Sequence, residues 1–427
     1  MRFFVIPAAV LTIAIPAMAA ASVTFHNDVL PVLQKKCQEC HRPGEAAPMS
    51  FLDYKSTRPW AKAIKTAMLS RKMPPWPADP HFGSFSNDRS LTEAELNTLV
   101  AWADTGALEG NSKDAPAPVK WVEGWTIGAP DAVVEMPQAF DVPASGTIDY
   151  QYVVIPTGFT EDRWVQLAEV RPGDRGVVHH VIAFIRPKGA KWLAGAAPGV
   201  PFVPGRGSRQ AEGGSMLGTE LLVGYAPGMP ATICRDGSAK LLPAGADIVF
   251  QLHYTANGKA ASDKTKIGLV FSKEPPQFRD VTMSAANNRF AIPAGDPNYE
   301  VHSQATLQQD TELVALMPHM HLRGKDFVYK VVYPDGRTET VLNIPRYDFA
   351  WQLEYNLEEP LPMPKGTRIE CTAHFDNSAN NPANPNPNIV VRWGDQSWDE
   401  MMIGWFDVII PASADPAKLL LRVGAGE

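Results

Sequence analysis

Short runs rich in Val, Ile, Phe and Tyr fill the chain after a polar, proline-interrupted stretch at residues 110–118. Residues 176–185, 246–254 and 327–332 are examples, and Gly or Pro separates the runs. This length and composition are typical of strands, and the Tyr-Pro-Asp-Gly sequence at 333–336 is a hairpin turn signal. The pattern predicts antiparallel β-structure, arranged as sandwiches or jelly rolls.

The composition excludes several classes of protein. Of the 427 residues, 45% are hydrophobic and 20% are charged, which is typical of a globular chain and not of a disordered one. The formal net charge of −7 leaves no basic excess for nucleic acid or anionic membranes. After the first residues, no run approaches the ~20 apolar residues that a transmembrane helix needs. We therefore expect no nucleic-acid partner and no membrane span.

The first residues have the pattern of a secretory signal. Met1 and Arg2 precede an apolar run that ends at Pro16, and small residues follow it. We expect residues 1–21 to be removed and the mature protein to be periplasmic or secreted. The four cysteines of the chain are too few for a disulfide scaffold, even in an oxidising compartment.

The Cys-Gln-Glu-Cys-His motif at 37–41 has the spacing of c-type haem attachment. Cys37 and Cys40 can form thioethers to the haem vinyl groups, and His41 can be an axial ligand of the iron. The alternative is a disulfide or a zinc pair, but no second C-x-x-C completes a zinc site. Residues 22–108 resemble the class I c-type cytochromes, which implies a small all-α domain that holds haem c.

Three methionines are candidates for the sixth iron ligand. Met49 lies only eight residues after His41, which leaves little chain to reach the other face of the porphyrin. Met68 shares a helical stripe with apolar residues and fits better as packing. Met73 lies just after that helix, in a loop that two prolines stiffen. We therefore favour Met73, with an exposed methionine or an unligated iron as the alternative.

Composition also divides the chain into domains. We expect a cytochrome domain at 22–108, a linker at 109–128, and two β-domains at 129–275 and 276–427. The Lys-Glu-Pro-Pro sequence at 273–276 marks the join between the β-domains. The predicted fold is a small all-α c-type cytochrome domain followed by two all-β jelly-roll sandwich domains.

Five of the ten histidines fall in the β-rich region in patterns that indicate metal binding. Residues i and i+2 of a strand share a face, so His319 and His321 can chelate one ion. Adjacent residues do not share a face, so His179 and His180 can bind one ion only if the strand is distorted or different ring nitrogens are used. His253 must be brought beside that pair by sheet packing. For any one of the five, an ordinary hydrogen-bonded histidine is the alternative.

Four motifs, taken in their order along the chain, resemble the copper type II ascorbate-dependent monooxygenases, the family of peptidylglycine- and dopamine-hydroxylating enzymes. The motifs are Val177-Val178-His179-His180, Gln251-Leu252-His253-Tyr254, His319-Met320-His321-Leu322-Arg323-Gly324-Lys325 and Asp399-Glu400-Met401. Each motif is weak alone, and the resemblance runs from about residue 133 to about residue 408. That family has two tandem jelly-roll domains with one copper ion in each.

The resemblance implies a role for each ligand set. It implies an electron-transferring copper ion at His179, His180 and His253. It implies an oxygen-binding copper ion, with the catalytic residues, at His319, His321 and Met401. Independently of the family, two imidazoles and a thioether form a neutral, partly soft set that suits cycling between Cu(I) and Cu(II).

Several residues depart from the family pattern or leave choices open. His374 is a rival ligand for the second copper ion, and Cys234 and Cys371 can either pair or remain free. The peptide-amidating members hold the substrate carboxylate with Arg, Asn and Tyr. At those positions this chain has Met317, Ile403 and Trp405. We therefore do not expect glycine-extended peptides as substrates.

Together these features predict an exported enzyme that hydroxylates a C–H bond of a small-molecule substrate with dioxygen, using haem c and two copper ions. Electrons would enter through the haem from an external donor, either ascorbate or a redox protein. One alternative is a non-catalytic cytochrome and copper protein that transfers electrons or carries copper. Another is a blue-copper site formed by Cys371, His374, His319 and Met401.

Overall fold

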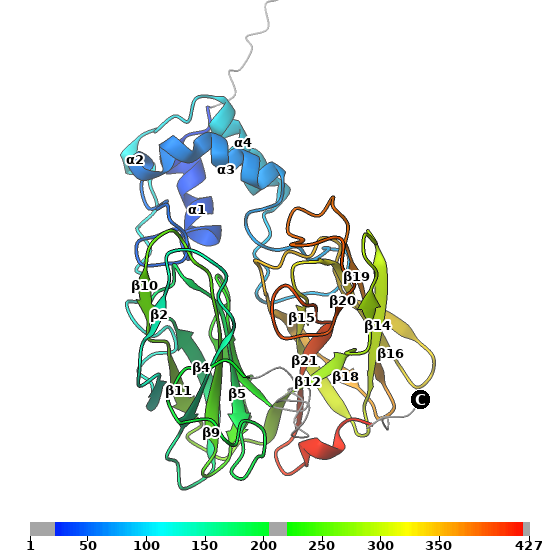
Figure 1. The fold of residues 1–427 in the computed structure, drawn as a ribbon. Helices are drawn as coiled ribbons and strands as arrows, with labels where there is room; N and C mark the ends of the chain where they lie inside the picture. Colours follow the sequence, from blue (N-terminus) through cyan, green and yellow to red (C-terminus); the bar gives the residue numbers. More distant parts are fainter. Residues whose placement is uncertain (1–21, 205–219, 422–427) are drawn as a thin grey trace, which may run out of the picture.

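The computed structural model describes residues 22–204 and 220–421 (Figure 1). The expected signal segment, residues 1–21, lies outside the described residues. Within the described parts of the chain, no helix is long and apolar enough to cross a membrane. The α-helices are α1 (Leu30–Lys36), α2 (Tyr54–Thr57), α3 (Ala61–Leu69) and α4 (Glu93–Asp104). Single helical turns are η1 (Phe25–Val29), η2 (Arg58–Trp60), η3 (Ser112–Asp114) and η5 (Pro416–Lys418).

Most of the remaining chain forms β-sheets. One four-stranded sheet has the order β3 (Gln151–Pro156), β9 (Asp247–Tyr254), β5 (Val178–Arg186) and β6 (Leu221–Tyr225). The other has the order β14 (Tyr299–Thr306), β19 (Arg368–Phe375), β16 (Gly324–Val332) and β17 (Thr338–Ile344). Two small sheets pair β2 (Phe140–Val142) with β10 (Ala261–Asp263), and β13 (Ala291–Ile292) with β20 (Val391–Arg392).

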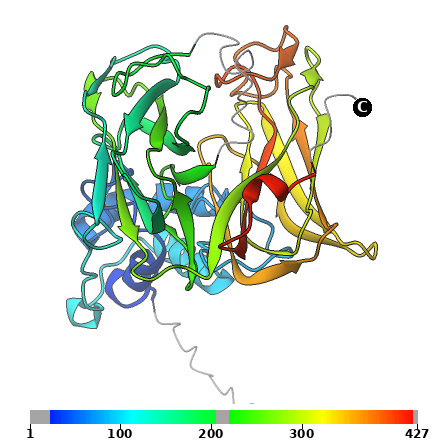
Figure 2. The same cartoon turned by 90° about the horizontal axis from the view of Figure 1, so that it is seen from below.

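A nine-stranded sheet extends through both parts of this β-structure. Its order is β1 (Ala132–Glu135), β11 (Lys266–Phe271), β4 (Arg163–Arg171), β8 (Ser238–Leu242), β12 (Phe278–Ala286), β21 (Ile403–Pro411), β15 (Thr311–His319) and β18 (Tyr355–Met363). A ninth strand, β7 (Thr232–Ile233), pairs with β4. Each four-stranded sheet shares a buried apolar core with one half of this sheet, so the protein has two β-halves, which Figure 2 shows side by side.

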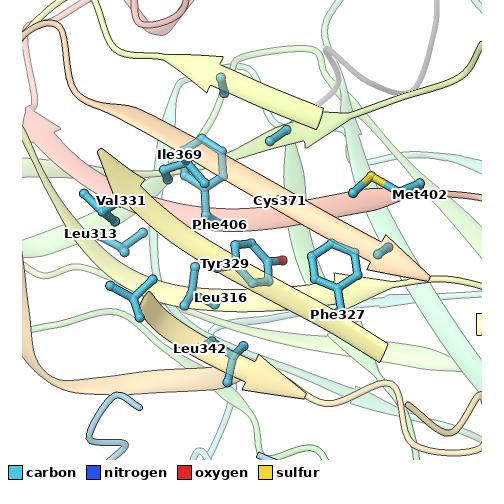
Figure 3. Close-up of a cluster of buried hydrophobic side chains, with 14 of the residues drawn as sticks. Leu313, Leu316, Phe327, Tyr329, Val331, Leu342, Ile369, Cys371, Met402 and Phe406 are labelled. Atoms are coloured by element: carbon cyan, nitrogen blue, oxygen red, sulfur yellow. The ribbon is translucent and has the colours of Figure 1, made fainter. Parts of the chain in front are cut away.

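The two cores are built from two kinds of strand: in some, buried and less buried residues alternate, and in others nearly every residue is buried. β9 is buried along almost its whole length, because Phe250 faces the core of the first half while Val249 faces a second apolar cluster. In the second half, Leu316, Tyr329 and Phe406 meet in the core drawn in Figure 3. Continuous burial of this kind explains why β9 reads as an apolar run in the sequence.

The expectation of two separate jelly-roll sandwiches is wrong, because one sheet continues across the expected join at 273–276. β8 precedes that join and β12 follows it, and the two strands pair in parallel with Phe278 opposite Ser238. Lys240 on β8 reinforces this junction, since its buried ammonium group lies 3.1 Å from a carboxylate oxygen of Asp280 and 3.1 Å from one of Asp407. Asp280 is on β12 and Asp407 is on β21, so this ammonium group, buried between two carboxylates, links β8 to two strands of the other half.

The expectation of an all-α cytochrome domain is also wrong. Four short helices form one small cluster, but the chain between α3 and α4 leaves it and lies on the second β-half. There Phe85 forms a β-bridge with Leu357, and its ring and that of Trp76 pack on Tyr355. Four prolines between residues 74 and 80 keep this segment extended and prevent a further helix.

Candidate metal centre

A β-bulge places the adjacent residues His179 and His180 on one site. In the ladder between β5 and β9, Val178 lies opposite Tyr254 and His180 lies opposite His253, so His179 is the extra residue. A bulge turns the extra side chain away from strict alternation. The sequence indicated that the pair could share an ion only if the strand were distorted or different ring nitrogens were used, and the bulge is a distortion of the strand at this position.

The three histidines of this first set offer donor atoms that all lie within 4.8 Å of one another. The Nδ1 atoms of His179 and His180 are 3.1 Å apart. Nε2 of His180 and Nδ1 of His253 are buried and have no hydrogen-bond partner. Buried polar atoms without a partner are rare in proteins, and they are expected where an ion binds. The first set therefore fits a metal ion.

His319 and His321 form the second set. His319 ends β15, His321 follows that strand, and their ring centroids are 5.2 Å apart. Nδ1 of His319 donates to Oε1 of Gln352 at 2.8 Å, and Nδ1 of His321 lies 3.3 Å from the carbonyl oxygen of Asp399. Nε2 of His321 is buried and without a partner. Partners at Nδ1 that leave Nε2 for the metal are the usual arrangement around metal-binding histidines.

Met401 lies two residues before the start of β21. His319 and Ile403 form the last pair in the antiparallel ladder of β15 and β21, and His321 and Met401 each lie two residues beyond that pair. The buried side chain of Met401 packs with Ile403 and Trp405, and half-buried Met317 joins them. The structure thus brings Met401 to the strand end that carries His319 and His321, among apolar neighbours.

The two sets are parts of a single cluster, which we call the five-histidine cluster. Ring centroids of His180 and His319 are 6.4 Å apart. Burial lowers the pKa of His179 and of His319 to about 4 each, and it lowers the pKa of the other three well below the usual value. The five rings are therefore neutral at neutral pH, which is the form that binds metal.

Two aromatic residues that the sequence did not single out line this cluster. The buried Tyr150 ring lies 4.5 Å from His253, 5.4 Å from His180 and 6.4 Å from His321, measured between centroids. Phe349 is stacked on His179 at 5.0 Å. Neither residue belongs to a motif, and both reach the cluster from loops, so no local signal in the sequence could identify them.

The Cys-x-x-Cys-His motif forms a tight turn in which the backbone N–H groups of Cys40 and His41 donate to the carbonyl of Cys37 (3.2 and 2.9 Å). Both thiols are free, and burial raises the pKa of Cys37 to about 12. The His41 ring is stacked on Phe51, and its Nδ1 is buried without a partner. Two free thiols and an imidazole whose buried Nδ1 lacks a partner, all on one turn, fit covalent haem attachment.

The structure separates one of the three methionine candidates from the other two. Met68 is buried in α3 within the apolar core of the helical cluster, as its helical spacing indicated. Met49 and Met73 are both half-buried and pack against that same core, as does Cys37. Met73 as the sixth ligand stays a prediction, with Met49 as the rival.

The haem-attachment segment is docked on the first β-half. Glu45 bridges two arginines, with one carboxylate oxygen 3.0 Å from Arg42 and the other 3.1 Å from Arg175. Arg175 stands in the loop just before β5, the strand that carries the His179–His180 pair. The turn after β6 approaches so closely that a Cβ atom on Gly228 would lie 4.0 Å from the sulfur of Cys40. The motif and the first histidine set therefore lie at the same end of this β-half.

Three other candidate residues lie outside the cluster. His374 is on the outer face of β19, where its ring nitrogens contact Asp326 (2.6 Å) and Glu300 (3.1 Å). Cys371 is on the opposite face of β19, buried in the core, so it and His374 are not placed to share an ion. Cys234 and Cys371 are both free and buried. This geometry removes the support for a blue-copper site.

No protein-family model matches the chain, and no curated protein matches it. A structure of the infectious bursal disease virus Gx strain aligns at 8% identity over 67% of this chain and 74% of that one, with a TM-score of 0.18. Allantoicase aligns at 8% identity over 56% of this chain and 79% of its own, with a TM-score of 0.17. PNGF-II aligns at 10% identity over 65% and 60%, with a TM-score of 0.21. TM-scores this low do not show a shared fold.

Proposed function

We propose that the protein is an exported monooxygenase that hydroxylates a C–H bond of a small-molecule substrate with dioxygen, with two copper ions in the five-histidine cluster and haem c at residues 37–41. One observation carries the proposal: three histidine donor atoms converge within 4.8 Å directly beside a second histidine pair. Distant parts of the sequence, on β5, β9 and β15, supply these neutral ligands to one place.

The chemistry of the ligands favours copper over other metals. Neutral imidazoles with a thioether nearby suit Cu(I) and Cu(II), whereas Mg²⁺ and Ca²⁺ need several oxygen ligands and non-haem iron usually needs a carboxylate. The carboxylate of Glu400, in the fourth motif, is already engaged, because its two oxygens accept from the backbone N–H groups of His321 (2.9 Å) and Arg323 (2.6 Å). Burial raises the pKa of Glu400 to about 8, which further weakens it as an anionic ligand.

The two histidine sets would have different roles in hydroxylation. Hydroxylation joins one oxygen atom to the substrate carbon and reduces the other to water, and it consumes two external electrons and two protons. Copper at the second set would activate dioxygen, and copper at the first set would store one of the electrons. Gln352 and the Asp399 carbonyl orient the second set, while Tyr150 and Phe349 keep water away from the first.

The surroundings of Met401 indicate which part of a substrate would reach the second set. Ile403, Trp405 and Met317 pack around Met401, and half-buried Trp393 contacts the same cluster. These side chains are apolar, so they favour an uncharged portion of the substrate beside Met401. A charged carboxylate there would lose its hydration without gaining a partner.

A measurement of oxygen uptake together with product mass tests this proposal. The copper-loaded and haem-loaded protein should incorporate one oxygen atom from ¹⁸O₂ into a substrate found by screening. Met401→His should suppress product, because it replaces the thioether that stabilises Cu(I). His81→Ala, at an exposed histidine whose ring contacts Asp79, should leave product formation unchanged. Product formation that survives Met401→His and His321→Ala would contradict the proposal.

One observation favours the alternative, a non-catalytic protein that transfers electrons or carries copper. His319 and His321 are only 6% and 0% exposed, so the second set is as enclosed as an electron-transfer site. Such a protein would bind copper and exchange electrons with haem without consuming dioxygen. Copper reduction by haem with no oxygen uptake, over a broad substrate screen, would establish the alternative.

A further inference from the structure

The loop between β17 and β18 joins the two histidine sets. Gln352 accepts from His319 Nδ1 through Oε1 (2.8 Å) and donates Nε2 to the carbonyl of Phe349 (3.1 Å). The hydroxyl of Tyr347 accepts from Met320 N (3.0 Å) and donates to Met320 O (2.8 Å). The loop is therefore fixed on the segment that carries the second set.

Phe349 extends from this loop over the first set. Its ring is stacked on that of His179, with centroids 5.0 Å apart and planes at 18°. Its centroid also lies 5.8 Å from His253 and 5.9 Å from His321. A stacked aromatic ring covers one face of an imidazole and brings no atom that binds a metal. Phe349 therefore acts on this cluster as a cover and not as a ligand.

Exposure identifies the outer side of the cluster. His179 is half-buried, and so is Phe349. The other four rings are almost completely enclosed, with exposed fractions of 3%, 8%, 6% and 0% for His180, His253, His319 and His321. Among the five histidines, His179 is thus the one nearest to solvent, and Phe349 lies directly on it.

An exposed carboxylate stands next to this cover. Asp348 precedes Phe349, and its Oδ1 accepts from the backbone N–H of Ala350 (2.9 Å), which fixes it at the loop surface. The Phe349 ring that follows it lies on His179, so this negative charge stands beside the more exposed side of the first set. A fixed negative charge at the mouth of a buried site raises the local concentration of cations.

We propose that Asp348, Phe349 and His179 form the access point through which copper reaches the five-histidine cluster. The Asp348 carboxylate attracts the ion, His179 is the first ligand that it meets, and the Phe349 ring must move aside before His180 and His253 complete the first set. This inference rests on the proposed function, because it takes copper to be the ion that the cluster holds.

Stopped-flow loading of the full metal-free chain with Cu(II) ions alone tests the access point. Phe349→Ala should load copper about tenfold faster, because no ring has to move aside before the ion reaches His180 and His253. Phe349→Trp keeps a ring at this position and should load no faster than the unchanged protein. Asp348→Asn should load roughly two- to fivefold more slowly at low salt, and salt should reduce this difference. The final copper content should be the same in these three variants and in the unchanged protein.

Phe159→Ala and Asp335→Asn, at a distant ring and an exposed turn, are the matched controls, and both should load at the rate of the unchanged protein.

A second measurement needs no copper. Diethyl pyrocarbonate should carbethoxylate His179 of the metal-free chain before it modifies the other four histidines of the cluster. Peptide mass spectrometry measures the modification of each. Phe349→Ala should accelerate modification of His180 and His253, and Phe349→Trp should restore protection. Equal modification of all five in the unchanged protein, or no effect of Phe349→Ala on either measurement, would overturn the access point. Normal copper content with those results leaves the proposed function standing, whereas a cluster that binds no copper contradicts the proposed function itself.

Discussion

The imidazole rings of His180 and His319 lie edge to face, with centroids 6.4 Å apart and planes at 84°. His180 is on β5 of a four-stranded sheet, and His319 ends β15 of the nine-stranded sheet. The two histidine sets therefore meet where the two β-halves adjoin. If each set holds an ion, a ligand of one ion, His180, lies beside a ligand of the other, His319.

This proximity predicts magnetic interaction between the two copper ions. Fully oxidised, copper-loaded protein should give an electron paramagnetic resonance spectrum broadened by spin–spin coupling, with a half-field signal. His321→Ala should remove one ion and leave the sharp spectrum of an isolated Cu(II). Two sharp, non-interacting signals from the unchanged protein would show that the sets are not adjacent when loaded.

Gln352 predicts a difference between two substitutions of similar size. Gln352→Leu removes the acceptor for His319 Nδ1, so the copper affinity of the second set should fall roughly 10- to 100-fold. Gln352→Glu keeps an acceptor oxygen and should retain most of the affinity. Competition titration with a copper chelator measures both, and Gln277→Leu, at an exposed glutamine, is the control. Equal affinities in Gln352→Leu and Gln277→Leu would show that this hydrogen bond does not orient the ligand.

The Glu45–Arg175 ion pair should hold the haem-attachment segment on the first β-half. Arg175→Gln should speed amide hydrogen exchange over residues 40–51, since the segment loses its contact with the loop before β5. In a double-mutant cycle with Glu45→Gln, the coupling should be about 0.2–1 kcal/mol, as for a pair near the surface. Arg163→Gln, which removes a more exposed arginine, should leave the exchange unchanged. Strictly additive effects of the two substitutions would refute the contact.

Glu354 predicts how stability depends on pH. Burial, followed by the charge of Asp407, raises the pKa of Glu354 to about 7, while Lys240 acts in the opposite direction. Between about pH 4.5 and about pH 7 the native state then holds a proton that the unfolded chain has lost, so this group makes the free energy of unfolding fall as pH rises. The decline is roughly 1.4 kcal/mol for each unit between the two pKa values.

The comparison of two neutralised variants isolates that effect. Glu354→Gln keeps the side-chain shape and removes the titration, so its free energy of unfolding should decline less over this pH range than that of the unchanged protein. Glu359→Gln, at an exposed position of β18, the strand that begins directly after Glu354, should show the unchanged slope. Denaturant unfolding across the range gives all three curves. Parallel curves for Glu354→Gln and the unchanged protein would mean that Glu354 titrates normally.

Local patterns in the sequence predicted the β-rich region and the ligand types, because strand runs and a motif such as residues 37–41 depend on neighbouring residues. The distortion that the His179–His180 pair requires could be stated from geometry, but not located. The extended segment around Phe85 was missed, because its aromatic side chains find their partner, Tyr355, in a distant part of the chain.

Long-range pairing also explains the remaining error in the fold. The proline-rich join at 273–276 has the composition of a boundary, yet β12 resumes beside β8 directly after it. Neighbouring residues in the sequence give no signal for a parallel pairing of this kind. They also give none for the loop that brings Phe349 to His179. The cluster itself depends on such contacts, which is why its ligands could be named individually while their assembly could not be derived.

Metal analysis of the purified chain shows whether the five-histidine cluster holds two copper ions. We expect two copper ions and one haem iron per chain, one copper ion fewer in His253→Ala and in His321→Ala, and an unchanged content in His81→Ala. A chain without copper, or one whose copper content is unaffected by His253→Ala and His321→Ala, would contradict this expectation.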